Sequence, residues 1–88
     1  MKELIKFIKA NKLKFQEGRR NSDSVILSGY ALYLGIEDVE DIKTAIESTL
    51  KDYDSDYAKE LEKVFSYAQD HNYESFWETD ESKKLYIF

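Results

Sequence analysis

The sequence predicts a mainly α-helical domain built from four helices. Hydrophobic residues recur at helical spacing, and polar or glycine residues stand where each periodic segment begins or ends. The chain contains no Pro and only three Gly, so few residues interrupt regular structure. Its 88 residues suit one compact domain covering 1–88, and the absence of Cys leaves the hydrophobic core to stabilise the fold without disulfides.

The first expected helix covers about residues 2–11. Three hydrophobic residues share one of its faces at helical spacing and three lysines occupy another, namely Leu4, Ile5 and Ile8 against Lys2, Lys6 and Lys9. This pattern is typical of a surface helix docked on a core. Residues 13–21 lose the period and contain Gly18, which predicts a connection that starts with a short strand at residues 12–15.

The second expected helix covers residues 24–34 and is hydrophobic nearly all round, so we expect it to be the central and most buried element. Ser22 or Asp23 is a suitable N-cap. Gly35 stands where a left-handed residue ends a helix, and Ile36 stands where a Schellman motif places a hydrophobic contact.

A β-hairpin is the alternative for this region. Residues 25–27 and 30–34 favour strands, and Ser28-Gly29 between them can form a two-residue turn. The fold would then be α+β, with a small antiparallel sheet from residues 12–34 and 84–88.

The third and fourth helices have the clearest periodicity. The hydrophobic stripes are Val39, Ile42, Ile46, Thr49 or Leu50, and Tyr53, and then Tyr57, Leu61, Val64, Phe65 and Ala68. Asn72 can end the fourth helix in the left-handed conformation. The last residues, 85–88, are hydrophobic with strand character, and we expect them to dock on the core or on a sheet edge.

Charge divides the chain at Ile36. Residues 1–36 contain seven Lys or Arg and three Asp or Glu, whereas residues 37–88 contain six and fifteen, and the net charge is −5. A net negative charge argues against direct nucleic-acid binding, because Lys and Arg supply most of that affinity. No segment approaches the roughly 18 apolar residues of a membrane span. The basic start lacks the features of a secretory signal, so we expect a cytoplasmic protein.

Two segments mix carboxylates with aromatic residues, a combination that suits partners rich in Arg and Lys. The expected contacts are Asp52, Tyr53, Asp54, Asp56 and Tyr57 in the first segment, and Tyr73, Glu74, Trp77 and Glu78 in the second. A structural role is the alternative, with Asp54 or Ser55 capping the fourth helix and Trp77 in the core. The first segment resembles a calcium loop only in its alternating Asp residues, so we expect no metal.

Two further charged features have a structural and a functional interpretation. The carboxylates of residues 37–41 suit the positive end of a helix dipole, and they can also face a basic partner. Arg19 and Arg20 can bind an anion at the start of the second helix, or they can pair with the acidic half of the same chain.

No catalytic pattern emerges, since the one histidine, His71, suits a helix C-terminus. We therefore expect a non-enzyme without cofactors. By size, acidity and helical content the chain is similar to small inhibitors such as nuclease immunity proteins and phage-encoded blockers, which cover a basic active site or nucleic-acid channel. An inhibitor of a basic, nucleic-acid-processing partner, acting as a nucleic-acid mimic, is the first hypothesis. The alternatives are a self-associating domain, in which the basic first helix of one copy meets the acidic half of another, and a nucleotide binder centred on Arg19 and Arg20.

Overall fold

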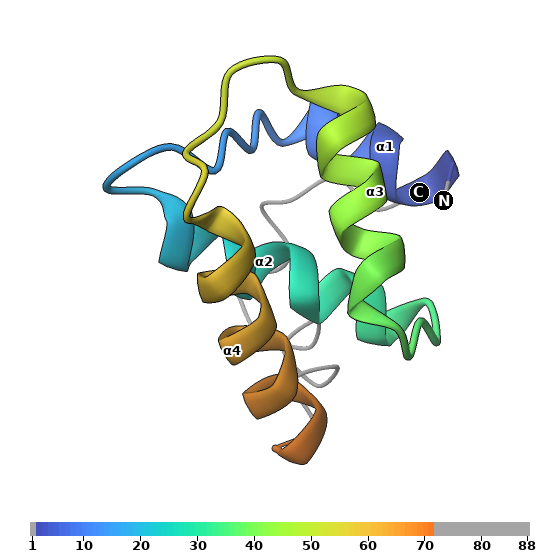
Figure 1. The fold of residues 1–88 in the computed structure, drawn as a ribbon. Helices are drawn as coiled ribbons and strands as arrows, with labels where there is room; N and C mark the ends of the chain where they lie inside the picture. The colour runs from blue at the N-terminus through green and yellow to red at the C-terminus, as the bar shows by residue number, and fades with distance from the viewer. Residues whose placement is uncertain (1, 72–88) are drawn as a thin grey trace.

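The computed structural model describes residues 2–71, which form four helices in chain order: α1 (Lys2–Ala10), α2 (Arg20–Tyr33), α3 (Val39–Thr49) and α4 (Tyr57–Asp70). The predicted mainly α-helical fold is confirmed. Figure 1 shows α2 running behind α3 and α4, with α1 at the upper right. The main packing pairs are α2 with α4 and α1 with α3, and α2 contacts all three other helices.

The core forms where the hydrophobic faces of the four helices meet. Its members are Leu4, Phe7, Ile8, Leu13, Phe15, Leu27, Tyr30, Ala31, Ile42, Ala45, Ile46, Tyr57, Leu61 and Phe65. The rings of Phe7 and Tyr30 stack with centroids 4.0 Å apart, which joins α1 to α2. The helix α2 is less completely buried than its composition predicts: half of its fourteen residues are buried, while Val25, Ile26 and Leu32 are partly exposed and Tyr33 is 55% exposed.

The start of α2 differs from the prediction. The helix begins at Arg20 rather than near Ser24, so Asp23 lies within its first turn and is not its N-cap. The Asp23 side chain is fully buried, and its Oδ2 accepts hydrogen bonds from the backbone N–H groups of Lys14 (2.9 Å) and Phe15 (3.1 Å). The N–H groups of Lys14 and Phe15 thus donate to a side chain and not to a neighbouring strand. Residues 13–16 have no regular secondary structure, so the prediction of a short strand at residues 12–15 is wrong.

The end of α2 agrees with the sequence. Gly35 adopts a φ of +84°, the N–H of Ile36 donates to the carbonyl of Ala31 at 3.0 Å, and the N–H of Gly35 donates to that of Leu32 at 3.0 Å. This pair of bonds is the Schellman motif. Because α2 is continuous through Ser28 and Gly29, the hairpin alternative is wrong, and residues 84–88 of its proposed sheet lie outside the described residues.

The third and fourth helices follow their hydrophobic stripes. Asp38 caps α3, since its side chain accepts a hydrogen bond from the N–H of Glu40 at 3.0 Å. The buried residues of α4 are the five predicted ones: Tyr57, Leu61, Val64, Phe65 and Ala68. The expectations for Asn72 and for residues 85–88 lie outside the described residues. Among residues 2–71, no helix has the length and apolarity that crossing a bilayer requires.

Candidate functional site

The first predicted contact segment, residues 52–56, is tied to the N-terminal half of the chain. Arg20 Nη1 lies 3.1 Å from Asp54 Oδ2 and 3.6 Å from Asp56 Oδ2. The N–H of Asp54 donates to the carbonyl of Phe15 at 3.0 Å. Asp54 Oδ1 also accepts from the N–H of Asp56 at 2.8 Å, which shapes the turn that leads into α4. Asp54 therefore holds two parts of the chain together, and its side chain is only 21% exposed.

Asp52 and Tyr53 differ in how much they offer to solvent. The Asp52 side chain is exposed, and its backbone carbonyl accepts a hydrogen bond from Gln16 Nε2 at 3.3 Å. Within residues 2–71, the Asp52 carboxylate forms no ion pair. Tyr53 is partly buried, with its ring edge-on to that of Tyr57 at a centroid distance of 4.9 Å. Asp52 is thus the carboxylate of this segment that is most available to a partner.

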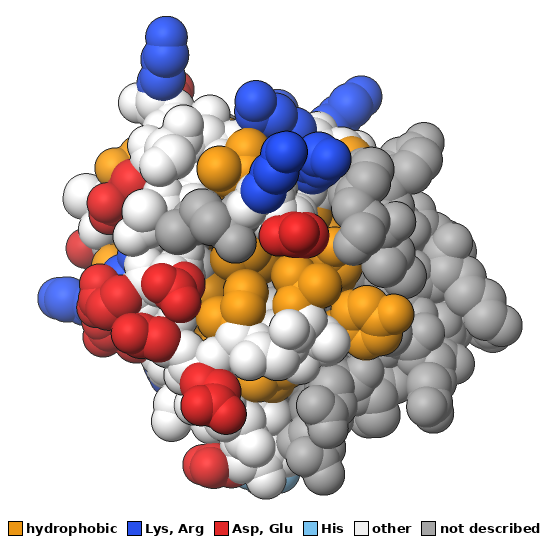
Figure 2. All heavy atoms as spheres, turned by 90° about the vertical axis from the view of Figure 1, so that its right-hand side faces the viewer, with side chains coloured by type: hydrophobic (Ala, Val, Ile, Leu, Met, Phe, Trp, Pro, Cys, Tyr) orange, Lys and Arg blue, Asp and Glu red, His pale blue; other side chains and the backbone are white. Residues whose placement is uncertain are grey.

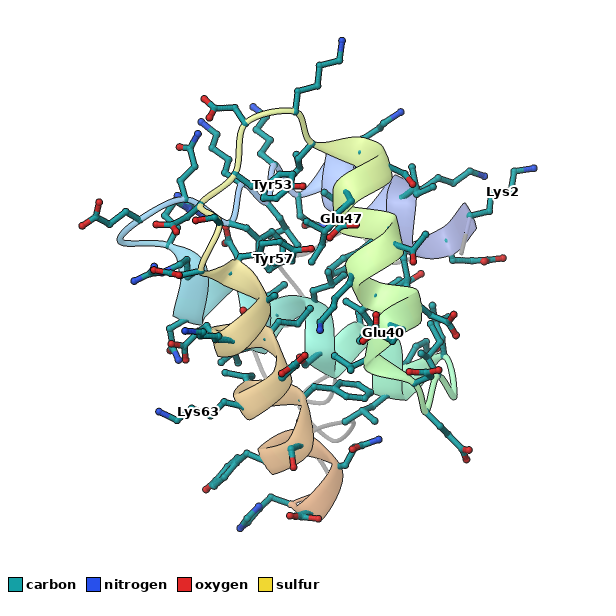
Figure 3. The ribbon with its side chains drawn as sticks, viewed as in Figure 1. Lys2, Glu40, Glu47, Tyr53, Tyr57 and Lys63 are labelled. Atoms are coloured by element: carbon teal, nitrogen blue, oxygen red, sulfur yellow. The ribbon has the colours of Figure 1, made fainter. Side chains whose placement is uncertain are left out.

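Tyr57 belongs to the interior. Its side chain is 2% exposed, and its hydroxyl donates to Glu47 Oε2 at 2.5 Å. Figure 3 shows Glu47 on α3 and Tyr57 at the start of α4 close together, with Tyr53 beside them. Burial raises the pKa of Tyr57 above its usual range, and the hydrogen bond to Glu47 raises that pKa further. Tyr57 therefore joins α3 to α4, and its ring is not available to a partner in this structure.

The two arginines have different partners. Arg19, with a side chain 54% exposed, lies 3.4 Å from the buried Asp23, whereas Arg20 bridges to Asp54 and Asp56. Arg20 thus pairs with the acidic half of the same molecule. The second predicted contact segment, with Tyr73, Glu74, Trp77 and Glu78, lies outside the described residues.

A second acidic region forms fewer contacts with the rest of the described chain. We call Glu37, Asp38, Glu40 and Asp41 the α3 acidic surface; all four are exposed, in the loop before α3 and in its first turn. Figure 2 shows a group of Asp and Glu side chains at the left of the face that it draws. Among residues 2–71, neither Glu37 nor Asp41 forms an ion pair. Within this surface, Glu37 and Asp41 therefore carry charge that no ion pair offsets among the described residues, while Asp38 and Glu40 have partners.

Lys43 bounds this surface on the side of α4. Its ammonium lies 3.4 Å from Glu40 Oε1 and also contacts Glu62, and its side chain is 15% exposed. The hydrogen bond from Lys43 to Glu62 raises the pKa of Lys43 above its usual value. Lys43 therefore offsets charge between α3 and α4, whereas Glu37 and Asp41 form no ion pair among the described residues.

An open groove of about 470 Å³ lies between α2 and α4. It is lined by Asn21, Val25, Glu60, Lys63, Val64, Ser66, Tyr67 and Asp70. Asn21 Nδ2 donates to Glu60 Oε2 at 3.0 Å, and Lys63 points outward from α4 in Figure 3. Glu60 and Asp70 outnumber Lys63 in this lining, so the groove does not favour an anionic ligand. Arg20 is already paired with Asp54 and Asp56, so this region gives no support to the hypothesis of a nucleotide binder.

The roles of Asp23, Glu47 and Lys43 were missed by sequence reasoning. Each role depends on a contact between residues from different elements, and hydrophobic periodicity carries no information about such contacts. Comparison with protein-family models, with curated proteins and with solved structures finds no match. The charge and geometry of the surface are therefore what indicates a function for this chain.

Proposed function

We propose that this protein is a non-enzymatic inhibitor that covers a basic surface of a nucleic-acid-processing partner with its α3 acidic surface. The observation that supports the proposal is the exposure of Glu37 and Asp41 on one helix end, where neither forms an ion pair among the described residues. Asp52 extends the contact from the α3–α4 connection. On sequence grounds, Tyr73, Glu74, Trp77 and Glu78 belong to the same proposal.

The physical basis is competition with nucleic acid for the partner's Lys and Arg side chains. Carboxylates on a rigid helix end present negative charge at fixed positions, as a phosphate backbone does. Their field also attracts a basic partner from a distance, which raises the association rate by about 10- to 1000-fold at low salt. Asp54 and Tyr57 contribute indirectly, because they hold the α3–α4 connection in place.

The test begins with affinity capture from cell lysate and continues with the purified captured protein. Association is followed by surface plasmon resonance across a salt series, together with the partner's activity on nucleic acid. We expect the rate to fall steeply with salt and the wild-type chain to inhibit that activity. Glu37→Lys with Asp41→Lys should lower the association rate by about tenfold or more, because charge reversal turns attraction into repulsion.

The matched control is Glu17→Lys with Asp70→Lys, which changes the net charge equally at two exposed positions outside the α3 acidic surface. It should retain most of the wild-type rate. An equal loss of association rate in the two double variants would mean that net charge alone sets the rate, and it would reject the α3 acidic surface as the contact. A rate that is independent of salt, or binding without inhibition, would reject the proposal.

A further inference from the structure

The exposed side of α1 carries a row of positive charge. Lys2, Lys6 and Lys9 recur at helical spacing and are all exposed, and we call them the α1 lysine row. Figure 3 shows Lys2 pointing away from the body of the molecule. No ion pair engages these lysines among residues 2–71. With one carboxylate, Glu3, against three lysines, α1 keeps a net positive charge on its exposed side.

Hydrophobic surface separates the two charged groups. Figure 2 shows Lys and Arg side chains at the top of the face, with one acidic side chain directly beneath them. Further Asp and Glu side chains lie at the left and below, and hydrophobic side chains occupy the middle of the face. On the elements that carry the two charged groups, Ile5, Ile36 and Val39 are partly buried hydrophobic residues that pack against the core. A hydrophobic centre with a charged rim is the usual composition of a protein–protein interface.

We infer that two copies of the chain pair through this face in a two-fold symmetric dimer. A two-fold axis in the interface, between the two charged groups, places the α1 lysine row of each copy opposite the α3 acidic surface of the other. The hydrophobic centres then meet each other. Because of the two-fold symmetry every charge contact occurs twice, so a modest attraction per pair is doubled. A pairing that placed the two lysine rows, or the two acidic surfaces, opposite each other would be disfavoured by repulsion.

The dimer also regulates the proposed function, and this part of the inference rests on that function. The α3 acidic surface is covered in the dimer, so the chain must dissociate before it can bind a basic partner. Self-association therefore lowers the apparent affinity for the partner in proportion to the fraction of chain that is monomeric.

The first test is sedimentation velocity of the purified chain across concentration and salt. We expect a dimer at about 0.05 M salt and a weaker dimer at about 0.5 M, because the charged rim is screened while the hydrophobic contact persists. A wild-type chain that stays monomeric at low salt up to millimolar concentration would overturn the inference.

The second test exchanges charges between the two groups. Lys6→Glu with Lys9→Glu reverses two of the three charges of the α1 lysine row, and Glu37→Lys with Asp41→Lys reverses the two carboxylates of the α3 acidic surface that form no ion pair among the described residues. Each variant alone then places like charges opposite each other and should be monomeric. An equimolar mixture of the two should form a heterodimer, since both sets of contacts again join opposite charges. The matched control is Lys14→Glu with Lys59→Glu, at exposed positions in the α1–α2 connection and on α4, and it should remain a dimer.

Each outcome decides the matter. A mixture that stays monomeric overturns the two-fold pairing, and circular dichroism of each variant verifies that it is folded.

Binding to the partner is measured separately on the double variant Lys6→Glu/Lys9→Glu. This variant should bind the captured basic protein more tightly than wild type because its acidic surface is free. Dimerisation without partner binding would reject the proposed function alone, and partner binding without dimerisation would reject this inference alone.

Discussion

Two acidic segments, residues 37–41 and residues 52–56, look alike in the sequence and differ in the structure. In the second, Arg20 pairs with Asp54 and Asp56, and Asp54 also shapes the turn into α4. In the first, Asp38 caps α3 and Glu40 meets Lys43, while Glu37 and Asp41 are solvated. The difference arises because the start of α2 lies beside the start of α4. A count of charges along the chain therefore does not give the charge of a surface.

Asp23 is the most completely paired of these carboxylates: it is buried and accepts hydrogen bonds from the N–H groups of Lys14 and Phe15 and from Arg19. Asp23→Ala would leave two backbone N–H groups of the loop without an acceptor. We expect the free energy of unfolding to fall by about 3 kcal/mol, since each buried donor left unsatisfied costs about 1–3 kcal/mol. Urea denaturation measures the change, and a loss under about 1 kcal/mol would mean that the loop does not depend on this carboxylate.

Asp54→Ala should have the next largest effect. Loss of the turn interaction and of the partly exposed ion pair with Arg20 should lower the free energy of unfolding by about 1–2 kcal/mol. A double-mutant cycle with Arg20→Ala isolates the pair, for which we expect a coupling of about 0.5–1 kcal/mol. Asp52→Ala is the matched control and should be nearly neutral. Equal effects of Asp52→Ala and Asp54→Ala would remove the distinction between matched and solvated carboxylates in this segment.

Tyr57→Phe removes only the hydroxyl that donates to Glu47, and we expect a loss of about 1 kcal/mol at neutral pH. The folded state raises the Tyr57 pKa above its ordinary value of 10.0, so the unfolded chain loses this proton first. The stability that Tyr57 contributes is therefore complete below pH 10.0 and decreases as the pH rises above it. Denaturation of wild type and Tyr57→Phe at several pH values should show convergence in alkali; a constant difference would contradict it.

Glu37→Lys with Asp41→Lys should have the smallest effect on stability. The change removes favourable contacts with the dipole of α3 and should cost about 0.5–1 kcal/mol. The same variant is expected to lose self-association and binding to a basic partner. A large loss of stability would place these carboxylates with Asp54, and the contrast between the two acidic segments would then disappear.

The parts of the fold that the sequence predicts are those that depend on residues close together in the chain. The stripes of α3 and α4 and the Schellman end of α2 depend on residues within a few positions of one another, so local patterns predict them. The start of α2 is not predicted, because Asp23 looks like an N-cap while its bonds go to Lys14 and Phe15. Of the candidate site, Asp52 is exposed as expected, whereas Tyr57 is a core residue because its own stripe in α4 faces inward.

The sequence by itself determined four helices, the end of α2, the hydrophobic faces of α3 and α4, and the unequal charge of the two halves. These follow from periodicity, capping and composition, which are local properties. Only the tertiary structure decided which charges neutralise each other and which remain exposed. That outcome depends on Arg20 lying beside Asp54, while the α1 lysine row, Glu37 and Asp41 form no ion pair among the described residues. Coulomb attraction acts on distances in space, and the packing of the helices sets those distances.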